Sequence, residues 1–309
     1  MRRTFALVFN ALAGVARPQL LDGVVTLLKR EGADVFQVAA RSSAEAALRI
    51  REIATTNAAD AVIAAGGDGT FRAVATGAAD TQLPVGFLPL GTGNVLAYEI
   101  GLKKNAAAIA VCLLNQPVVP VRGGLINGEA FFLMAGAGYD ARIVHGLDYK
   151  TKRLIGRAAY AMPVLRTLAH GADRFDVVVD GASFNASWVI VTRSSRYGGS
   201  FVLTEQTCIG EDQMLAILID AKSRSGLMRA SLELGLGRLT AAKTRPDFVT
   251  VLPAKRVQIG RQVSAPLQVD GDDAALSPAE IVAEGPVVQL IVPPAYAATL
   301  SKRHTNRLL

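Results

Sequence analysis

The feature that most constrains the fold of this chain is a glycine-rich turn that follows a short apolar run. Residues 61–65 are all apolar, which is typical of a strand buried in a parallel sheet, and residues 66–70 then have the sequence Gly-Gly-Asp-Gly-Thr. A helix is predicted to begin at Phe71 and to continue to Ala78. Glycine lets the backbone approach a ligand closely, and the N–H groups of a helix N-terminus attract phosphate. The segment therefore predicts a phosphate-binding turn, and a tight turn without a ligand is the alternative.

A second glycine loop follows the next apolar strand. Residues 83–90 are predicted to form that strand, residues 91–94 have the sequence Gly-Thr-Gly-Asn, and a helix is predicted over residues 95–100. Both loops are expected at the carboxyl ends of neighbouring parallel strands, where ligands bind in open α/β sheets. Asp68 would repel a phosphate unless Mg²⁺ or a hydroxyl group intervenes. The two loops together therefore indicate metal-assisted phosphate chemistry, with Asn94 bracing the second loop or satisfying turn carbonyls.

Composition narrows the class of protein and of partner. The chain has 309 residues, of which 50% are hydrophobic and 19% are charged, so we expect a globular protein with room for two domains. Its net charge of +7 favours anionic partners: a nucleotide, an acidic membrane surface or nucleic acid. Nucleic acid has the least support, because no basic run is interleaved with aromatic residues. Cys112 and Cys208 lie in apolar runs and are expected to be buried thiols without a metal or a disulfide.

Strand and helix patterns predict two kinds of domain. Strands at 4–9, 34–39 and 61–65 alternate with helices at 19–31 and 44–55, which predicts a parallel, doubly wound sheet. From Val118 the pattern changes to an antiparallel β domain, in which Asn-Gly and Asp-Gly pairs mark tight turns. Further strands are predicted at 118–121, 129–135, 174–179, 186–193, 214–220, 248–252, 256–260 and 266–269, with helices at 106–115, 153–170 and 226–235.

Six short motifs follow one another along the chain: residues 9–14 (Phe-Asn-Ala-Leu-Ala-Gly), 66–70, 91–94, 136–141 (Gly-Ala-Gly-Tyr-Asp-Ala), 196–199 (Arg-Tyr-Gly-Gly) and 270–272 (Asp-Gly-Asp). Together and in this order they resemble the diacylglycerol kinase catalytic-domain superfamily, which includes bacterial lipid kinases, sphingosine kinases and ceramide kinases. The resemblance implies a nucleotide-binding α/β domain at residues 1–121, joined by the C-terminal segment 287–309. It also implies a β-rich lipid-substrate domain at 122–286, with the active site in the cleft between the two.

The resemblance also implies roles for individual residues. Asp272 stands where the family commonly has glutamate as general base on the lipid hydroxyl, and Asp68 would be a second catalytic carboxylate. Asp140 would lie near the lipid headgroup and phosphate. A structural Mg²⁺ would bind the Asp212 carboxylate and the carbonyls of Ile209 and Met214. The residues expected to contact ATP are Asn10, Gly66, Gly67, Asp68, Gly69, Thr70, Phe71, Arg72, Gly91, Thr92, Gly93 and Asn94.

Each of these roles has a plainer alternative. Asp270-Gly271 is first of all a turn signal, and Asp273 would replace Asp272 as base if the register shifted by one residue. Asp140 would serve equally as a helix N-cap, and residues 209–214 as a solvated acidic turn. Arg72, Arg142, Arg193 and Arg196 supply positive charge, and the plainer alternative for such residues is an ordinary solvated surface charge. His145 is assigned no role.

Four positions depart from the family pattern: Ala11, Ala73, Val95 and Gln213. We expect an ATP-dependent lipid kinase that transfers the γ-phosphoryl group of ATP to a hydroxyl of a diacylglycerol-like or sphingoid lipid. An NAD kinase-like enzyme and a catalytically weak nucleotide- or lipid-binding protein are the alternatives. No segment reaches the ~20 apolar residues of a membrane span. We therefore expect a cytoplasmic protein that contacts anionic membranes peripherally, through residues 150–157 and the helix they open. The lipid and the oligomeric state, with a homodimer among the alternatives, stay open.

Overall fold

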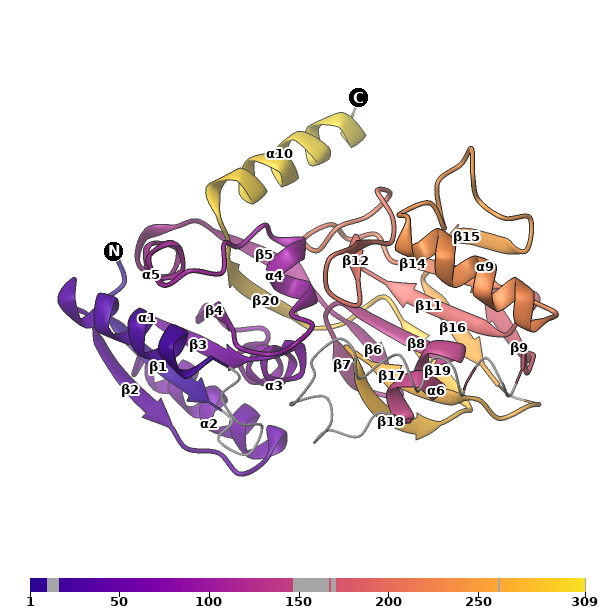
Figure 1. Cartoon of the computed structure of the whole chain (residues 1–309). Helices are drawn as coiled ribbons and strands as arrows, with labels where there is room; N and C mark the ends of the chain where they lie inside the picture. The colour runs from indigo at the N-terminus through magenta and orange to yellow at the C-terminus, as the bar shows by residue number, and fades with distance from the viewer. Residues whose placement is uncertain (10–16, 147–166, 168–170, 261, 309) are drawn as a thin grey trace. The chain divides into compact units, whose positions relative to one another are not determined.

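The computed structural model describes residues 1–9, 17–146, 167, 171–260 and 262–308, and these form two compact units (Figure 1). Unit 1 comprises Met1–Arg122 and Pro286–Leu309, and unit 2 comprises Gly123–Gly285. Asn10, most of the helix predicted at 153–170 and the basic residues that open it lie outside the described residues.

Unit 1 contains, in its described part, one six-stranded sheet with the order β2-β1-β3-β4-β20-β5. The pairs among the first five strands in this order are parallel, and only β5 runs antiparallel, so the predicted doubly wound parallel sheet is confirmed. Residues 61–65 of β3 are completely buried, as their apolar run predicts. The strands are β1 (Thr4–Phe9), β2 (Asp34–Val38), β3 (Ala61–Gly66), β4 (Pro84–Pro89), β5 (Val118–Arg122) and β20 (Val287–Ile291).

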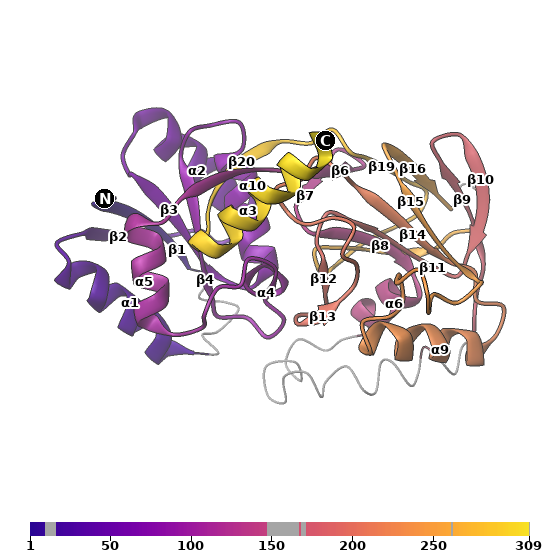
Figure 2. The same ribbon diagram turned by 90° about the horizontal axis from the view of Figure 1, so that it is seen from above.

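Helices cover both faces of this sheet. One face carries α1 packed with α5, and the other carries α2 packed with α3 (Figure 2). Ser42 and Asn105 begin α2 and α5 as N-caps, because their side-chain oxygens accept backbone N–H groups of Glu45 (3.1 Å) and Ala108 (2.9 Å). The helices of unit 1 are α1 (Pro18–Arg30), α2 (Ser43–Thr56), α3 (Asp68–Ala78), α4 (Val95–Glu99), α5 (Ala106–Asn115) and α10 (Pro294–Leu308).

Unit 2 has two six-stranded sheets within its described residues, and the strand pairs in both are antiparallel. The predicted antiparallel β domain is thus confirmed. The sheets share one buried apolar core, to which Phe131 and Val257 contribute from the first sheet and Val189 and Leu218 from the second. The first sheet contains β6 (Gly124–Ile126), β7 (Glu129–Phe131), β9 (Phe175–Val179), β10 (Ala182–Ala186), β16 (Arg256–Ile259) and β19 (Ala279–Val282).

The remaining elements of unit 2 are a second six-stranded sheet, a two-stranded sheet and the described helices. The second sheet contains β8 (Met134–Gly138), β11 (Trp188–Thr192), β14 (Leu215–Ile219), β15 (Val249–Pro253), β17 (Pro266–Val269) and β18 (Asp272–Leu276), while β12 (Arg196–Tyr197) pairs with β13 (Phe201–Val202). Two described helices belong to this unit, α6 (Tyr139–His145) and α9 (Arg224–Gly235). The sequence patterns missed α6, α10 and the short strands β6, β10, β12, β13, β18 and β19.

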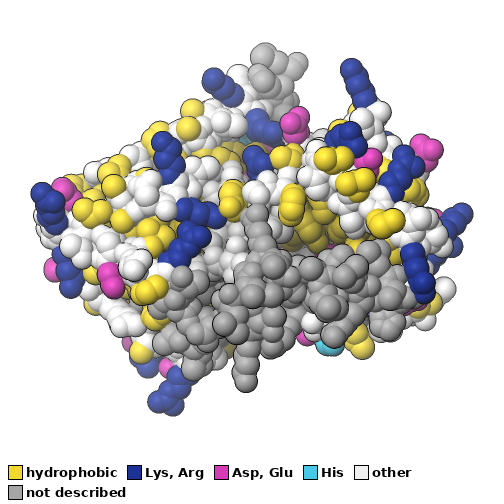
Figure 3. All heavy atoms as spheres, in the orientation of Figure 1, with side chains coloured by type: hydrophobic (Ala, Val, Ile, Leu, Met, Phe, Trp, Pro, Cys, Tyr) yellow, Lys and Arg dark blue, Asp and Glu magenta, His cyan; other side chains and the backbone are white. Residues whose placement is uncertain are grey.

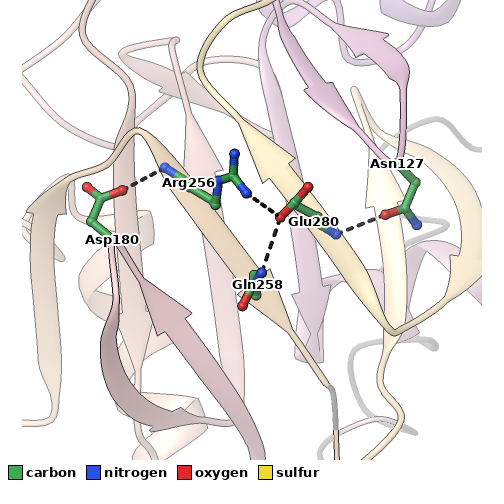
Figure 4. A network of polar contacts seen from close by, with 5 residues as sticks. All are labelled: Asn127, Asp180, Arg256, Gln258 and Glu280. Carbon is green, nitrogen blue, oxygen red and sulfur yellow. Dashed lines mark hydrogen bonds and ion pairs between the residues drawn. The ribbon is translucent and has the colours of Figure 1, made fainter.

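Tight turns and polar contacts set the edges of the first sheet of unit 2. Asn127 and Asp180, each followed by glycine, have φ values of 48°, the left-handed conformation expected of such hairpin turns. The Asp180 carboxylate accepts the Arg256 N–H at 2.7 Å. The Glu280 carboxylate accepts Arg256 Nη1 (3.1 Å) and Gln258 Nε2 (3.2 Å), while Asn127 Oδ1 accepts the Glu280 N–H (Figure 4). These contacts align neighbouring strands on the exposed face of the sheet.

One predicted strand is wrong. The apolar pattern over residues 129–135 predicts a single strand, but the chain leaves the first sheet after β7 and enters the second at β8. The break falls at Phe132 and Leu133, whose backbone N–H groups bond to the carboxylate of Asp270 instead of to a neighbouring strand. A side chain distant in sequence therefore competes with the strand ladder for these amides.

Both cysteines are free and buried, as predicted. Burial raises the pKa of the Cys112 thiol to about 11, so the thiol stays protonated and unreactive at neutral pH. Among the helices that the structure describes, none has the length and apolar character needed to cross a membrane.

Candidate active site

The two glycine loops of unit 1 lie against each other, as predicted. Gly66 at the end of β3 is in register with Pro89 of β4, and the Gly66 carbonyl accepts the N–H groups of Leu90 (2.9 Å) and Gly91 (3.2 Å). A Cβ atom at position 91 would lie only 2.7 Å from the Cα of Gly67. Only glycine at position 91 allows this approach, so the sequence of the second loop fixes how closely the first can pack.

Asp68 joins the first loop to the helix that follows the second. It is the first residue of α3, after the N-cap Gly67. Its carboxylate oxygens accept the backbone N–H groups of Val95 (2.9 Å) and Leu96 (3.1 Å) at the start of α4. Two charge-assisted hydrogen bonds at a helix N-terminus hold the loops in one arrangement. This positioning contact is the geometry that the structure gives Asp68, and its catalytic role stays a prediction.

Asn94 holds the second loop in shape. Its side chain is 1% exposed, its φ is 51°, and its Nδ2 donates to the Gly91 carbonyl at 2.6 Å, which is the expected bracing contact. Its Oδ1 has no hydrogen-bond partner among the described residues. A buried acceptor without a donor costs about 1–3 kcal/mol, so this loop conformation is held at some cost to stability.

In unit 2 the Asp-Gly-Asp motif begins with a turn whose first residue is structural. Asp270 and Gly271 have φ values of 50° and 83°, which is the tight hairpin between β17 and β18. The Asp270 carboxylate, 6% exposed, accepts the N–H groups of Phe132, Leu133 and Met134 at 2.9 to 3.0 Å. Asp270 therefore fixes the crossing from β7 to β8.

The register separates the two acids that follow the turn. Asp272 is the first residue of β18 and lies opposite Val269, whereas Asp273 lies opposite Gln268, so the two side chains point to opposite faces of the hairpin. Asp273 pairs with His145 of α6 at 2.9 Å, and both side chains are exposed. Asp272 is partly exposed. No role was predicted for His145, because its pairing with Asp273 joins two elements that are distant in sequence.

Asp140 is a buried carboxylate at the centre of a polar cluster. The residue is 2% exposed. Its Oδ2 accepts hydrogen bonds from Tyr197 Oη (3.1 Å) and Gln268 Nε2 (3.2 Å), and its Oδ1 accepts one from the Ala141 N–H (2.7 Å). Burial raises the pKa of Asp140 to about 7, and these hydrogen bonds oppose that shift. The N-cap of α6 is Gly138, so the N-cap alternative for Asp140 is wrong.

Gln268 connects this cluster to the turn, and sequence reasoning missed it. Its Nε2 donates to Asp140 while its Oε1 accepts the Gly271 N–H at 3.0 Å, so one side chain spans from Asp140 to the residue preceding Asp272. A Cβ at Gly136 would lie 2.5 Å from Asp140 Oδ2, so glycine is needed beside the cluster. The available signal was a polar residue between the apolar Leu267 and Val269 in a buried strand.

Two family models match the chain. Residues 4–126 match the diacylglycerol kinase catalytic domain, and residues 134–293, more than half of the chain, match the YegS C-terminal NAD kinase beta sandwich-like domain. The chain belongs to the diacylglycerol kinase catalytic-domain superfamily. The two glycine loops of this family member lie in the first match, and Asp140, Gln268 and the Asp-Gly-Asp turn lie in the second.

Relatives of this lipid kinase family cover most of the chain. A diacylglycerol kinase of Mycobacterium tuberculosis is 28% identical over 300 residues, 92% of this chain and 93% of the relative. The diacylglycerol kinase of Bacillus subtilis is 25% identical over 72% of this chain and 74% of its own length. A probable YegS-like lipid kinase of Klebsiella pneumoniae is 32% identical over about half of each chain, 53% and 54%.

Solved structures share the fold of this family member. A crystal structure of a diacylglycerol kinase from Bacillus anthracis has a TM-score of 0.66 at 16% identity and covers 95% of this chain and 98% of its own. A second structure from the same organism has a TM-score of 0.75 at 21% identity, with coverages of 95% and 96%. At these identities the likeness establishes the fold alone.

The loop in which the family resemblance implies Mg²⁺ offers few ligands. Asp212 is exposed, and the Met214 carbonyl already accepts the Ala254 N–H at 3.0 Å. Within the described residues, no group of three or more His, Cys, Asp or Glu side chains is arranged to hold a metal ion. One carboxylate and two carbonyls fit a Mg²⁺ that keeps several of its waters, and they do not fit an ion enclosed by protein ligands.

A buried arginine organises that loop. Arg193 is 1% exposed, so the alternative of a solvated surface charge is wrong for this residue. Its guanidinium donates to the carbonyls of Glu211 (3.4 Å), Asp212 (3.2 Å) and Ala283. Glu211, itself 2% exposed, accepts the Cys208 N–H at 3.1 Å through Oε2. The loop is therefore held by buried charged groups rather than being a solvated acidic turn.

Proposed function

We propose that this member of the lipid kinase family transfers the γ-phosphoryl group of ATP to a hydroxyl of a diacylglycerol-like or sphingoid lipid. The observation that carries the proposal is the pair of glycine loops at the carboxyl ends of β3 and β4, which the Asp68 carboxylate joins. Phosphoryl transfer depends mainly on holding the phosphates and on electrostatic stabilisation, and closely packed glycine loops at helix N-termini suit that task.

Unit 1 would hold the nucleotide through residues 66–72 and 91–94. Bound Mg²⁺ would screen the phosphate charge when present. Unit 2 would supply the acceptor side of the reaction. Asp272 accepts the proton of the lipid hydroxyl while the hydroxyl oxygen forms a bond to the γ-phosphorus. The bond between the γ-phosphorus and the bridging oxygen breaks, and ADP leaves with its electron pair. Asp140 would lie near the lipid headgroup, and Gln268 links its carboxyl to the backbone N–H of Gly271, the residue before Asp272.

NAD is the second candidate acceptor, because the C-terminal match describes an NAD kinase-like β sandwich. The two candidates differ in the polarity of the acceptor. A lipid acceptor needs an apolar surface for its chains, whereas NAD needs groups that recognise a second nucleotide.

The test is transfer of label from γ-labelled ATP, with Mg²⁺, to a panel of diacylglycerol, monoacylglycerol, sphingosine, ceramide and NAD. Asp272→Asn is compared with wild type, and Asp273→Asn is the matched control, since it removes the neighbouring charge on the opposite face of the hairpin. We expect a labelled lipid, a loss of about a hundredfold or more in kcat for Asp272→Asn, and little change for Asp273→Asn. Labelled NAD would contradict the proposal. ATP binding without any labelled product would instead indicate a nucleotide-binding protein without kinase activity on these acceptors.

A further inference from the structure

Helix α9 of unit 2 is apolar on two sides. Leu227, Ala230 and Leu234 are buried against the domain, as expected for a packed helix. On the outer side, at intervals of four residues, Met228 is 59% exposed and Leu232 is 60% exposed. Leu236, one turn further and just after the helix, continues this row and is 54% exposed. Residues four apart lie above one another on a helix, so the three form one stripe of about 12 Å.

The stripe has an apolar neighbour. Strand β13 packs against α9, and its Phe201 is 41% exposed. We call the surface formed by Met228, Leu232 and Leu236 the α9 face. Single exposed apolar residues are ordinary on soluble proteins, but a row of large ones indicates a surface that binds something.

Positive charge surrounds the α9 face. The segment from Lys222 to Asp247 contains six basic and two acidic residues, so it carries +4 of the net charge of +7 of the chain. Lys222, Arg224 and Arg229 are exposed on or next to the helix. The one acid on α9, Glu233, is paired with Arg238 at 2.9 Å. Figure 3 shows hydrophobic side chains over α9 with Lys and Arg side chains around them.

We propose that the α9 face is a docking surface for an anionic phospholipid membrane. An interfacial helix inserts its large apolar side chains between lipid headgroups. Arginines at the borders of the helix then lie against the lipid phosphates. A second copy of the chain is a poorer occupant, because a self-complementary contact would bring two strongly positive surfaces together. The inference rests on the proposed function in one respect, namely that a membrane lipid is the acceptor.

The test measures membrane binding without turnover. Wild-type protein is floated with vesicles of phosphatidylcholine alone and of phosphatidylcholine mixed with phosphatidylglycerol. The variant Met228→Gln/Leu232→Gln removes the stripe, and Leu48→Gln is the matched control, because Leu48 is 72% exposed on α2 of unit 1. We expect binding to the anionic vesicles only, a loss of about tenfold or more in the stripe variant, and no loss in the control. Lys222→Gln/Arg224→Gln is expected to weaken binding most at low salt.

Two further readouts separate this inference from the proposed function. Thermal unfolding of each variant shows that the exposed substitutions leave the fold intact. Transfer to a water-soluble short-chain diacylglycerol is expected to be unchanged in the stripe variant, whereas transfer to the same lipid class in vesicles falls with binding. Equal binding of wild type and stripe variant, or none by wild type, would overturn the inference whatever the kinase assay gives. So would a wild-type dimer, seen by sedimentation velocity, that the stripe substitutions dissociate.

Discussion

Replacing Asp270 tests whether the first acid of the Asp-Gly-Asp motif is structural. Its buried carboxylate accepts the N–H groups of three consecutive residues, 132–134, where the chain crosses between the two sheets of unit 2. Asparagine tolerates the left-handed backbone at this position, so Asp270→Asn changes the hydrogen bonding and leaves the turn conformation favourable. The variant therefore tests the contribution of the carboxylate without changing the preferred conformation of the turn.

The magnitude follows from the bonds lost. Asparagine has one oxygen, so at least one of the three N–H groups must face the new amide NH₂ and loses its acceptor. A hydrogen bond to a charged group contributes ~1.5–3 kcal/mol, and a buried N–H without a partner costs ~1–3 kcal/mol. We therefore expect Asp270→Asn to lower the free energy of unfolding by about 3 kcal/mol. Alanine, which satisfies none of the three and resists a positive φ, should lower it by about 5 kcal/mol or more.

Equilibrium unfolding in urea, followed by the fluorescence of Trp188 in unit 2, measures this loss. Asp180→Asn is the matched control, because Asp180 occupies the same kind of Asp-Gly turn and accepts the N–H groups of Lys255 and Arg256, but it is exposed. Water replaces lost partners there, so we expect a change below about 1 kcal/mol. Equal losses for the two variants would refute the argument that burial of the Asp270 bonds makes them decisive.

Three other changes give distinct outcomes. Burial raises the pKa of Asp140 from its ordinary 3.8 to about 7, so between about pH 4 and pH 7 the folded chain holds a proton that the unfolded chain has lost. The free energy of unfolding therefore falls as pH rises through this range, by at most about 1.4 kcal/mol per pH unit. Asp140→Asn should flatten that slope when urea unfolding is measured across the range. Gly91→Ala should lower both the melting temperature and the ATP affinity measured by calorimetry, whereas Gly67→Ala, whose Cβ would make an ordinary 3.7 Å contact, should leave the melting temperature unchanged. Asp68→Asn should lower kcat/KM about a hundredfold by displacing the loops, and a fall in kcat far beyond the loss of ATP affinity would instead indicate a direct catalytic role.

The elements of unit 1 could be predicted from the sequence because each pattern there is local. The apolar run before Gly66 is typical of a buried strand, and the glycines that follow mark the turn into α3. The positions of both loops in the sheet followed from these local signals. In unit 2 the hairpin turns at Asn127 and Asp180 were equally local signals. The family resemblance then supplied what patterns do not, including the return of the C-terminal segment to the first sheet, where β20 lies between β4 and β5.

The features that the sequence did not reveal depend on partners distant along the chain. Asp270 breaks an apparently continuous strand more than a hundred residues earlier, at Phe132 and Leu133. Gln268 gains its meaning only from Asp140 on one side and Gly271 on the other. Arg193 resembles any surface arginine until the fold encloses it. In each case a polar group is satisfied by tertiary contacts, and no periodicity records them.

The place of β20 in the first sheet has a consequence for the order of events during synthesis. The ribosome releases β1 to β5 first, then all of unit 2, and only afterwards the strand that pairs with both β4 and β5. Until then β4 and β5 expose unpaired edges that invite wrong pairings. The first sheet of the nascent chain therefore stays incomplete until all of unit 2 has been synthesised. We expect any dependence on chaperones to end once residues 287–291 are available to pair with β4 and β5.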